Sequence, residues 1–182
     1  MNFRPLGIDG AFEIELSPRR DERGYFARTF DGGAFADHGL ATEWVQDNES
    51  HSLVRGTVRG LHFQRPPHAE SKFVRVVRGA ILDVFVDLRR SSPTYGRHEM
   101  LELSFDKHNA VHVPRGCAHG FCTLADDTIV LYKVDAPYAP EAEGGLLWND
   151  PGLDIAWPSF ATILSARDAA LPGWRGFVSP FH

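Results

Sequence analysis

Short apolar runs, separated by glycine and proline, dominate the chain. They predict β-strands over residues 72–77, 80–88, 99–105, 110–114, 120–124 and 128–134. The 12 prolines and 17 glycines place turns between these runs. The turns recur at about the 8–12-residue spacing that is typical of an all-β sandwich or barrel. We therefore expect an all-β fold, a double-sheet barrel of the jelly-roll type.

Helical patterns are scarce and short, which fits peripheral helices on such a barrel. Residues 31–38 and 165–170 are the two candidates. In the second, Ser165 is placed as the N-cap and Asp168 as the third helical residue. The 182 residues contain no repeat, linker or low-complexity segment, so we expect one domain over residues 1–182.

Charge and hydropathy exclude several classes of protein. The net charge of −5, without a basic cluster, argues against nucleic-acid binding. No apolar run approaches the roughly 20 residues of a membrane helix, and no apolar segment follows Arg4 as in a secretory signal.

The two cysteines are poorly placed to form a disulfide with each other, because Cys117 and Cys122 fall on opposite faces of one predicted strand. We expect reduced thiols in a cytoplasmic protein.

The run from Arg59 to Gln64 places polar residues where a buried strand is expected. By alternation, His62 and Gln64 share one face of this strand. Arg59 falls on the other face unless the strand bends at Gly60, a plausible bulge site. Imidazole is suited to proton transfer near neutral pH, so His62 is a candidate base.

Two further strands carry polar groups in apolar rows. Lys72 lies in line with the valines of its strand, and Tyr132 lies between Val130 and Val134. His119 begins another strand. Burying such groups is costly unless they are paired or solvated. A ligand cavity inside a small barrel relieves that cost.

These residues, in this order, resemble the dTDP-4-dehydrorhamnose 3,5-epimerases, which are cupin-fold enzymes of deoxysugar biosynthesis. The resemblance runs from about Arg23 to Asp168. It rests on Gln46–Asn48, Arg59–Gln64, Lys72, Arg115–Phe121, Tyr132, Tyr138–Glu141, Trp148–Pro151 and Ser165–Asp168.

The resemblance implies an isomerase that inverts C3 and C5 of a nucleotide-linked 4-keto-6-deoxyhexose through an enolate. It assigns His62 as the base, Asp168 as the carboxylate partner of His62, Tyr132 as the acid on the opposite face and Lys72 as the group that stabilises the enolate oxygen.

It further implies a homodimer that needs no cofactor and no metal. His119 is placed near the sugar, and Arg59 and Gln46 at the diphosphate. The remaining substrate-binding candidates are Arg23, Phe26, Asn48 and Tyr138. The chain departs from the family at Arg28, where the family often has glutamate at the nucleotide end of the site, so the identity of the nucleotide stays open.

The residues alone leave other interpretations open. Asp168 is also suited to the start of a helix, Tyr132 to the core and Lys72 to an exposed strand edge. A metal-dependent cupin is the first alternative function, although Gln64 stands where a second histidine ligand is expected. A non-catalytic binding module and an epimerase acting only at C3 or only at C5 are the others.

Overall fold

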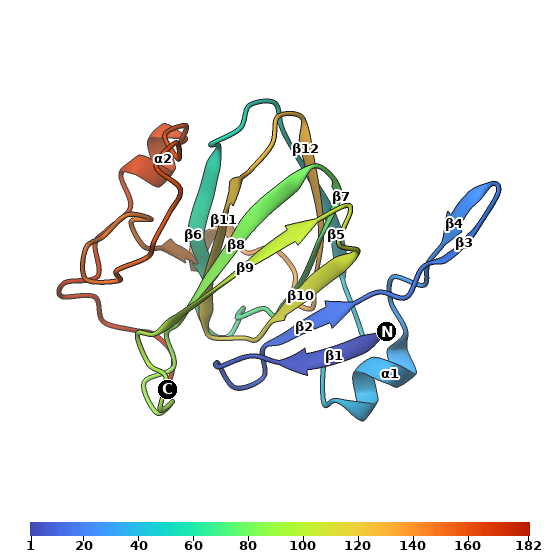
Figure 1. The fold of residues 1–182 in the computed structure, drawn as a ribbon. Helices are drawn as coiled ribbons and strands as arrows, with labels where there is room; N and C mark the ends of the chain where they lie inside the picture. Colours follow the sequence, from blue (N-terminus) through green and yellow to red (C-terminus); the bar gives the residue numbers. More distant parts are fainter.

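The computed structural model describes all residues, 1–182, and most of them belong to two antiparallel sheets that form a barrel (Figure 1). The strands are β1 (Asn2–Pro5), β2 (Phe12–Glu15), β3 (Arg19–Asp21), β4 (Gly24–Phe26), β5 (Gln46–Ser52), β6 (Val58–Gln64), β7 (Lys72–Arg78), β8 (Ala80–Asp87), β9 (His98–Ser104), β10 (Asn109–Val113), β11 (Cys117–Thr123), β12 (Thr128–Val134) and β13 (Glu143–Gly145).

One sheet has the strand order β1-β2-β10-β7-β12-β5, and the other has the order β13-β6-β11-β8-β9. This arrangement is the expected all-β jelly roll of the cupin type. Strands β3 and β4 form a separate hairpin that projects away from the barrel (Figure 1). All the predicted strands form, although β11 begins at Cys117 instead of Gly120.

Both predicted helices are confirmed and both are short. Helix α1 (Gly32–Asp37) is capped by Asp31, and α2 (Ala166–Ala169) is capped by Ser165, whose hydroxyl accepts a hydrogen bond from the backbone N–H of Asp168. A 3-10 turn, η1 (Pro140–Ala142), precedes β13. No helix in the structure has the length and apolar character needed to cross a membrane.

Apolar side chains from both sheets fill the space between the sheets. This core contains Ile8, Ala11, Val74, Val76, Ile81, Phe85, Leu103, Val111, Val113, Cys117, Phe121 and Val130. Cys122 packs instead with Val58 and Ala161 in a separate cluster, which confirms that the two thiols lie on opposite faces of their strand. Burial raises the pKa of Cys117 to about 12 and that of Cys122 to about 11, so both thiols stay protonated.

Strand β5 and its polar sequence show where the hydrophobic pattern fails. The residues Gln46 to Ser52 contain no apolar side chain, yet they pair with β12 along their whole length. Gln46, Asn48 and Ser50 alternate along the strand, and each lines a cavity. The inward-facing side chains of β5 border the cavity instead of the core, so the strand does not show the usual alternation of apolar and polar residues.

Candidate active site

A two-lobed cavity adjoins the core and opens between the two sheets. Its large lobe has a volume of about 680 Å³ and its small lobe a volume of about 280 Å³. His62, Lys72 and Tyr132 line both lobes, so these three residues mark the junction. His62 comes from one sheet, whereas Lys72 and Tyr132 come from the other.

A bulge in β6 places Arg59 and His62 at the same cavity. The pairing of β6 with β11 shifts register between His119 and Phe121, and Gly60 has a positive φ of 133° at this point. A Cβ atom on Gly60 would lie 2.5 Å from the Cα of Gly120, so only glycine fits. The extra residue of a bulge redirects the side chains that follow it. The predicted bend at Gly60 is confirmed, and Arg59 lines the large lobe together with His62.

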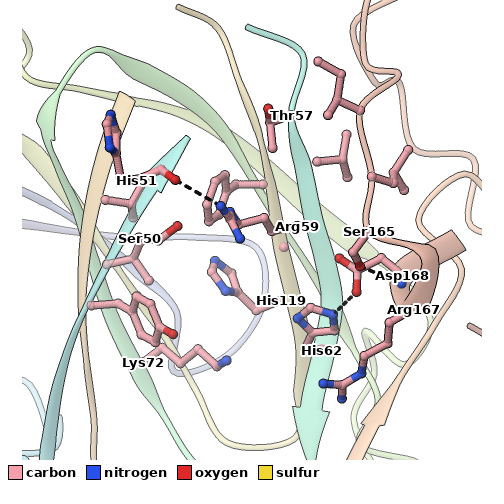
Figure 2. Close-up of a pocket in the computed structure, with 18 of the residues that line it drawn as sticks. Ser50, His51, Thr57, Arg59, His62, Lys72, His119, Ser165, Arg167 and Asp168 are labelled. Atoms are coloured by element: carbon pink, nitrogen blue, oxygen red, sulfur yellow. Dashed lines mark hydrogen bonds and ion pairs between the residues drawn. The ribbon is translucent and has the colours of Figure 1, made fainter. Parts of the chain in front are cut away.

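The imidazole of His62 forms a hydrogen bond with the carboxylate of Asp168, which lies in α2 next to β6 (Figure 2). The Nε2 atom of His62 lies 2.8 Å from Oδ1 of Asp168, while the backbone N–H of Gly60 donates to Oδ2 at 3.2 Å. Asp168 is only 5% exposed. A carboxylate only accepts hydrogen bonds, so it holds the proton of His62 on Nε2. The Nδ1 atom is then free to accept a proton.

The surroundings of His62 favour its neutral form. Burial lowers its pKa below the usual value, the bond to Asp168 opposes this shift, and the charges of Lys72 and Arg167 add to it. Desolvation disfavours the charged imidazolium, and nearby cations act in the same direction. At neutral pH the ring is therefore unprotonated at Nδ1, which is the state that a general base needs.

Lys72 and Tyr132 are half-buried on neighbouring strands. The Nζ atom of Lys72 lies 5.9 Å from the centre of the Tyr132 ring. Lys72 does not lie on an edge strand, because β7 runs between β10 and β12. Burial raises the pKa of Tyr132, and the negative charge of Glu70 raises it further. The phenol therefore keeps its proton at neutral pH and is available as an acid.

A second histidine–carboxylate pair, more deeply buried than the first, lies beside the large lobe. His119 is the register partner of His62 across β6 and β11, and both side chains line the large lobe. The Nε2 atom of His119 lies 2.8 Å from Oδ2 of Asp83, which is fully buried. This pair fixes the orientation of the His119 ring beside the junction.

The predicted diphosphate and nucleotide residues divide between the two lobes. Arg59 lines the large lobe, where its guanidinium donates to Ser52 and to the carbonyl of His51 without a carboxylate partner (Figure 2). The small lobe is lined by Gln46, Asn48 and Tyr138. The loop that carries Tyr138 is fixed to β5, because the backbone N–H of Tyr138 donates to Oε1 of Gln46 at 2.6 Å.

Arg23, Phe26 and Arg28 lie outside this cavity. Arg23 follows β3 and pairs with Asp21, whereas Phe26 ends β4 and is 71% exposed. Arg28 pairs with Asp31 and, together with Phe26, lines a different hollow near the N-terminus. Within one chain, the structure does not bring these three side chains to His62.

Gln64 occupies a structural position on β6. The two N–H groups of its amide are shared among Glu70 and the carbonyls of His68 and Pro137, and its oxygen accepts from the backbone N–H of Ala139. No group of three or more His, Cys, Asp and Glu side chains is arranged to hold a metal ion. The donor set at His62 therefore does not fit the two-histidine, one-carboxylate pattern of a metal-dependent cupin.

Sequence reasoning missed three cavity or near-cavity residues. Asp83 had a usable signal, because a carboxylate in the middle of the apolar run 80–88 must have a buried partner. Glu70 follows two prolines in a loop, and Arg167 lies in a very short helix. Neither segment has a hydrophobic pattern that reveals which way the side chain points.

The family model and the similar proteins of known function all point to one family. The family model for dTDP-4-dehydrorhamnose 3,5-epimerase matches residues 5–175. A dTDP-4-dehydrorhamnose 3,5-epimerase of Sinorhizobium fredii is 47% identical over 94% of this chain and 89% of its own length. A dTDP-4-dehydrorhamnose 3-epimerase of Streptomyces niveus is 43% identical over 92% of this chain and 81% of its own length.

The solved structures agree with the fold. The crystal structure of dTDP-4-dehydrorhamnose 3,5-epimerase from Bacillus anthracis, with TDP and PPi bound, has a TM-score of 0.92 and 43% identity. The match covers 94% of this chain and 98% of that one. With the family model matching nearly the whole length, the chain belongs to the dTDP-4-dehydrorhamnose 3,5-epimerase family of isomerases.

Proposed function

We propose that this protein inverts C3 and C5 of dTDP-4-keto-6-deoxyglucose to give dTDP-4-dehydrorhamnose. The observation that carries the proposal is the His62–Asp168 pair, placed at the junction of a cavity that Lys72 and Tyr132 line from the opposite sheet. Epimerisation needs a base and an acid on opposite sides of a sugar ring, and this junction supplies both.

Proton removal is the first step. The C4 carbonyl of the sugar acidifies the protons at C3 and C5, and Nδ1 of His62 accepts one of them. Asp168 stabilises the imidazolium that forms, because its carboxylate is bonded to Nε2. The electron pair of the broken C–H bond moves into the enolate, whose oxygen carries the new negative charge.

Lys72 and Tyr132 complete the inversion. The ammonium of Lys72 stabilises the enolate oxygen as its charge develops, which lowers the barrier. Tyr132 then gives its phenolic proton to the same carbon from the face opposite His62. Burial supports this role, since it raises the pKa of Tyr132 and keeps the hydroxyl protonated until the enolate forms.

The nucleotide end of the substrate has candidate partners in both lobes. Arg59 has no carboxylate partner and presents a planar cation to the cavity, which suits two oxygens of a diphosphate. Gln46 and Asn48 supply neutral hydrogen-bonding groups, and Tyr138 supplies an exposed ring for stacking. His119 binds the sugar beside His62.

We further propose that the active form is a homodimer. The β3–β4 hairpin carries Arg23 and Phe26 away from the barrel of its own chain (Figure 1). In a dimer this hairpin reaches the cavity of the second copy and adds Arg23 to its diphosphate site. Arg28 then lies near the nucleotide instead of the sugar.

We also propose a cytoplasmic location for the protein, because its two thiols are buried and protonated, which suits a reducing compartment.

The test is to incubate the protein with dTDP-4-keto-6-deoxyglucose in D₂O and follow the sugar by NMR. We expect deuterium at C3 and C5 and the accumulation of product inverted at both carbons. Exchange at C3 alone would favour the second candidate, a C3 epimerase, to which the Streptomyces niveus relative points. No exchange at either carbon would contradict the proposal.

A further inference from the structure

Glu70 forms an ion pair with the lysine at the junction of the cavity. Its Oε1 atom lies 3.1 Å from Nζ of Lys72, and the side chains are 11% and 13% exposed. Glu70 lies in the loop between β6 and β7 and lines the small lobe. A buried ion pair of this kind costs desolvation energy, so its presence calls for an explanation beyond stability.

Gln64 fixes the other side of this carboxylate. The Nε2 atom of Gln64 donates to Oε2 of Glu70 at 3.1 Å, and it also faces the carbonyls of His68 at 3.0 Å and Pro137 at 3.2 Å. The Oε1 atom of Gln64 accepts from the backbone N–H of Ala139 at 2.7 Å. Main-chain groups on both ends of the amide therefore prevent it from turning over.

Glu70 is the hydrogen-bond acceptor in both of its contacts. One oxygen of Glu70 meets an amide N–H of Gln64, and the other meets the ammonium of Lys72. A carboxylate supplies both acceptors, whereas a carboxamide supplies one acceptor and one donor. A glutamine at this position would place a donor against either Gln64 or Lys72 and would break one of the two contacts.

We propose that Glu70 is a positioning residue that holds the Lys72 ammonium where the enolate oxygen develops. The proposal rests on the function proposed above for Lys72. The row Gln64–Glu70–Lys72 also joins the lysine to the loop of Tyr138, because Gln64 bonds to Pro137 and Ala139 on either side of that residue. The lysine is thereby tied to the part of the small lobe that is assigned to the nucleotide.

The negative charge of Glu70 also acts on Tyr132. It adds to burial in raising the pKa of that phenol, whereas the charge of Arg59 from β6 lowers it, and the Lys72 ammonium lies 5.9 Å from the ring centre. Removing the charge should therefore lower the pKa of Tyr132. The alkaline limb of the pH–rate profile for inversion should then move to lower pH. This shift reports the loss of the Glu70 charge beside Tyr132, whereas the position of the Lys72 ammonium is tested by kcat in the double-mutant cycle below.

A double-mutant cycle tests the proposal directly. Glu70→Gln should lower kcat about 10-fold with KM changed less than about threefold, because a displaced group loses transition-state contact more than ground-state binding. In the Lys72→Met background, the same change at Glu70 should cost less than about twofold, since its effect acts through the lysine. The low kcat values of Lys72→Met and of the double variant are measured in long incubations.

Glu13→Gln is the matched control. Glu13 is a half-buried carboxylate on β2 that also accepts from an amide, Asn109, and from a cation, Arg4, outside the cavity. It should leave kcat and the alkaline limb unchanged. If Glu70→Gln fails to fold, Glu70→Asp provides the same cycle, because its shorter carboxylate cannot reach both partners.

Two results would overturn the proposal: a kcat for the Glu70 variant equal to that of Glu13→Gln, or an equal loss with and without Lys72. Failure of the underlying function has a different signature. If Lys72→Met itself retains wild-type kcat, the role of the lysine is wrong whatever Glu70 does.

Discussion

The carboxylate of Asp168 binds both the imidazole of His62 and the backbone of the strand that carries it. Oδ1 lies 2.8 Å from Nε2 of His62, and Oδ2 accepts from the N–H of Gly60 at 3.2 Å. One side chain from α2 thus fixes the ring and the bulge beside it. The orientation of His62 therefore depends on a residue 106 positions later in the chain.

Asp168→Asn should slow epimerisation and leave substrate binding in place. An asparagine presents one acceptor, so it cannot serve both the ring of His62 and the N–H of Gly60. We expect a loss of about 10²-fold or more in kcat, the scale of general-base effects. Steady-state kinetics with a dTDP titration measures both quantities. Asp127→Asn, at the exposed His51–Asp127 pair, is the control and should retain kcat.

The acid limb of kcat/KM should lie below pH 6.5, because burial lowers the pKa of His62. The base works when neutral, so activity is complete above that limb and falls as the pH drops through it. In Asp168→Asn, the bond that raises the pKa of His62 is weakened, and the limb should move to still lower pH. A limb that stays in place or moves upward would show that His62 does not titrate there.

Tyr132→Phe should separate proton exchange from inversion. The variant keeps the ring and loses only the hydroxyl, so dTDP binding should hold. Proton removal by His62 should still exchange deuterium into at least one carbon, while inverted product falls sharply. NMR of the sugar in D₂O reports both. Tyr95→Phe, at a tyrosine outside the cavity, should match wild type. Full inversion by Tyr132→Phe would remove the tyrosine from the mechanism.

Arg28→Glu should change nucleotide preference without changing the chemistry. Arg28 pairs with Asp31 next to the hairpin that carries Phe26, far from the proton-transfer groups of its own chain. We expect the ratio of inversion to exchange to be unchanged and the relative kcat/KM for dTDP, UDP, GDP and CDP sugars to shift. An unchanged nucleotide profile would mean that this departure from the family carries no substrate information.

The barrel was predictable because its core strands follow simple rules. Strands β7 to β12 have apolar rows that face the core, and both helices have side-chain caps, Asp31 and Ser165. Strand β5 was not predictable from its pattern, since cavity-facing residues replaced the apolar row. The β3–β4 hairpin is exposed along both strands, so no hydrophobic alternation marks it.

The site was predictable only in part. Polar residues in apolar rows pointed to His62, Lys72 and Tyr132. Asp168 came from the resemblance alone, because nothing local in its helix shows that the chain returns it to β6. Glu70 was invisible for the same reason: its contact with Lys72 depends on the path of the loop after Pro67. Long-range pairs of this kind are set by the tertiary fold.

The central claim is that His62 is the base, and solvent exchange in His62→Asn tests it most directly. Wild-type protein should incorporate deuterium from D₂O at C3 and C5 of dTDP-4-keto-6-deoxyglucose. The variant should remain folded, bind dTDP and lose exchange at both carbons by about 10²-fold or more. Exchange by His62→Asn at a rate near that of wild type would contradict the account and place the base elsewhere in the cavity.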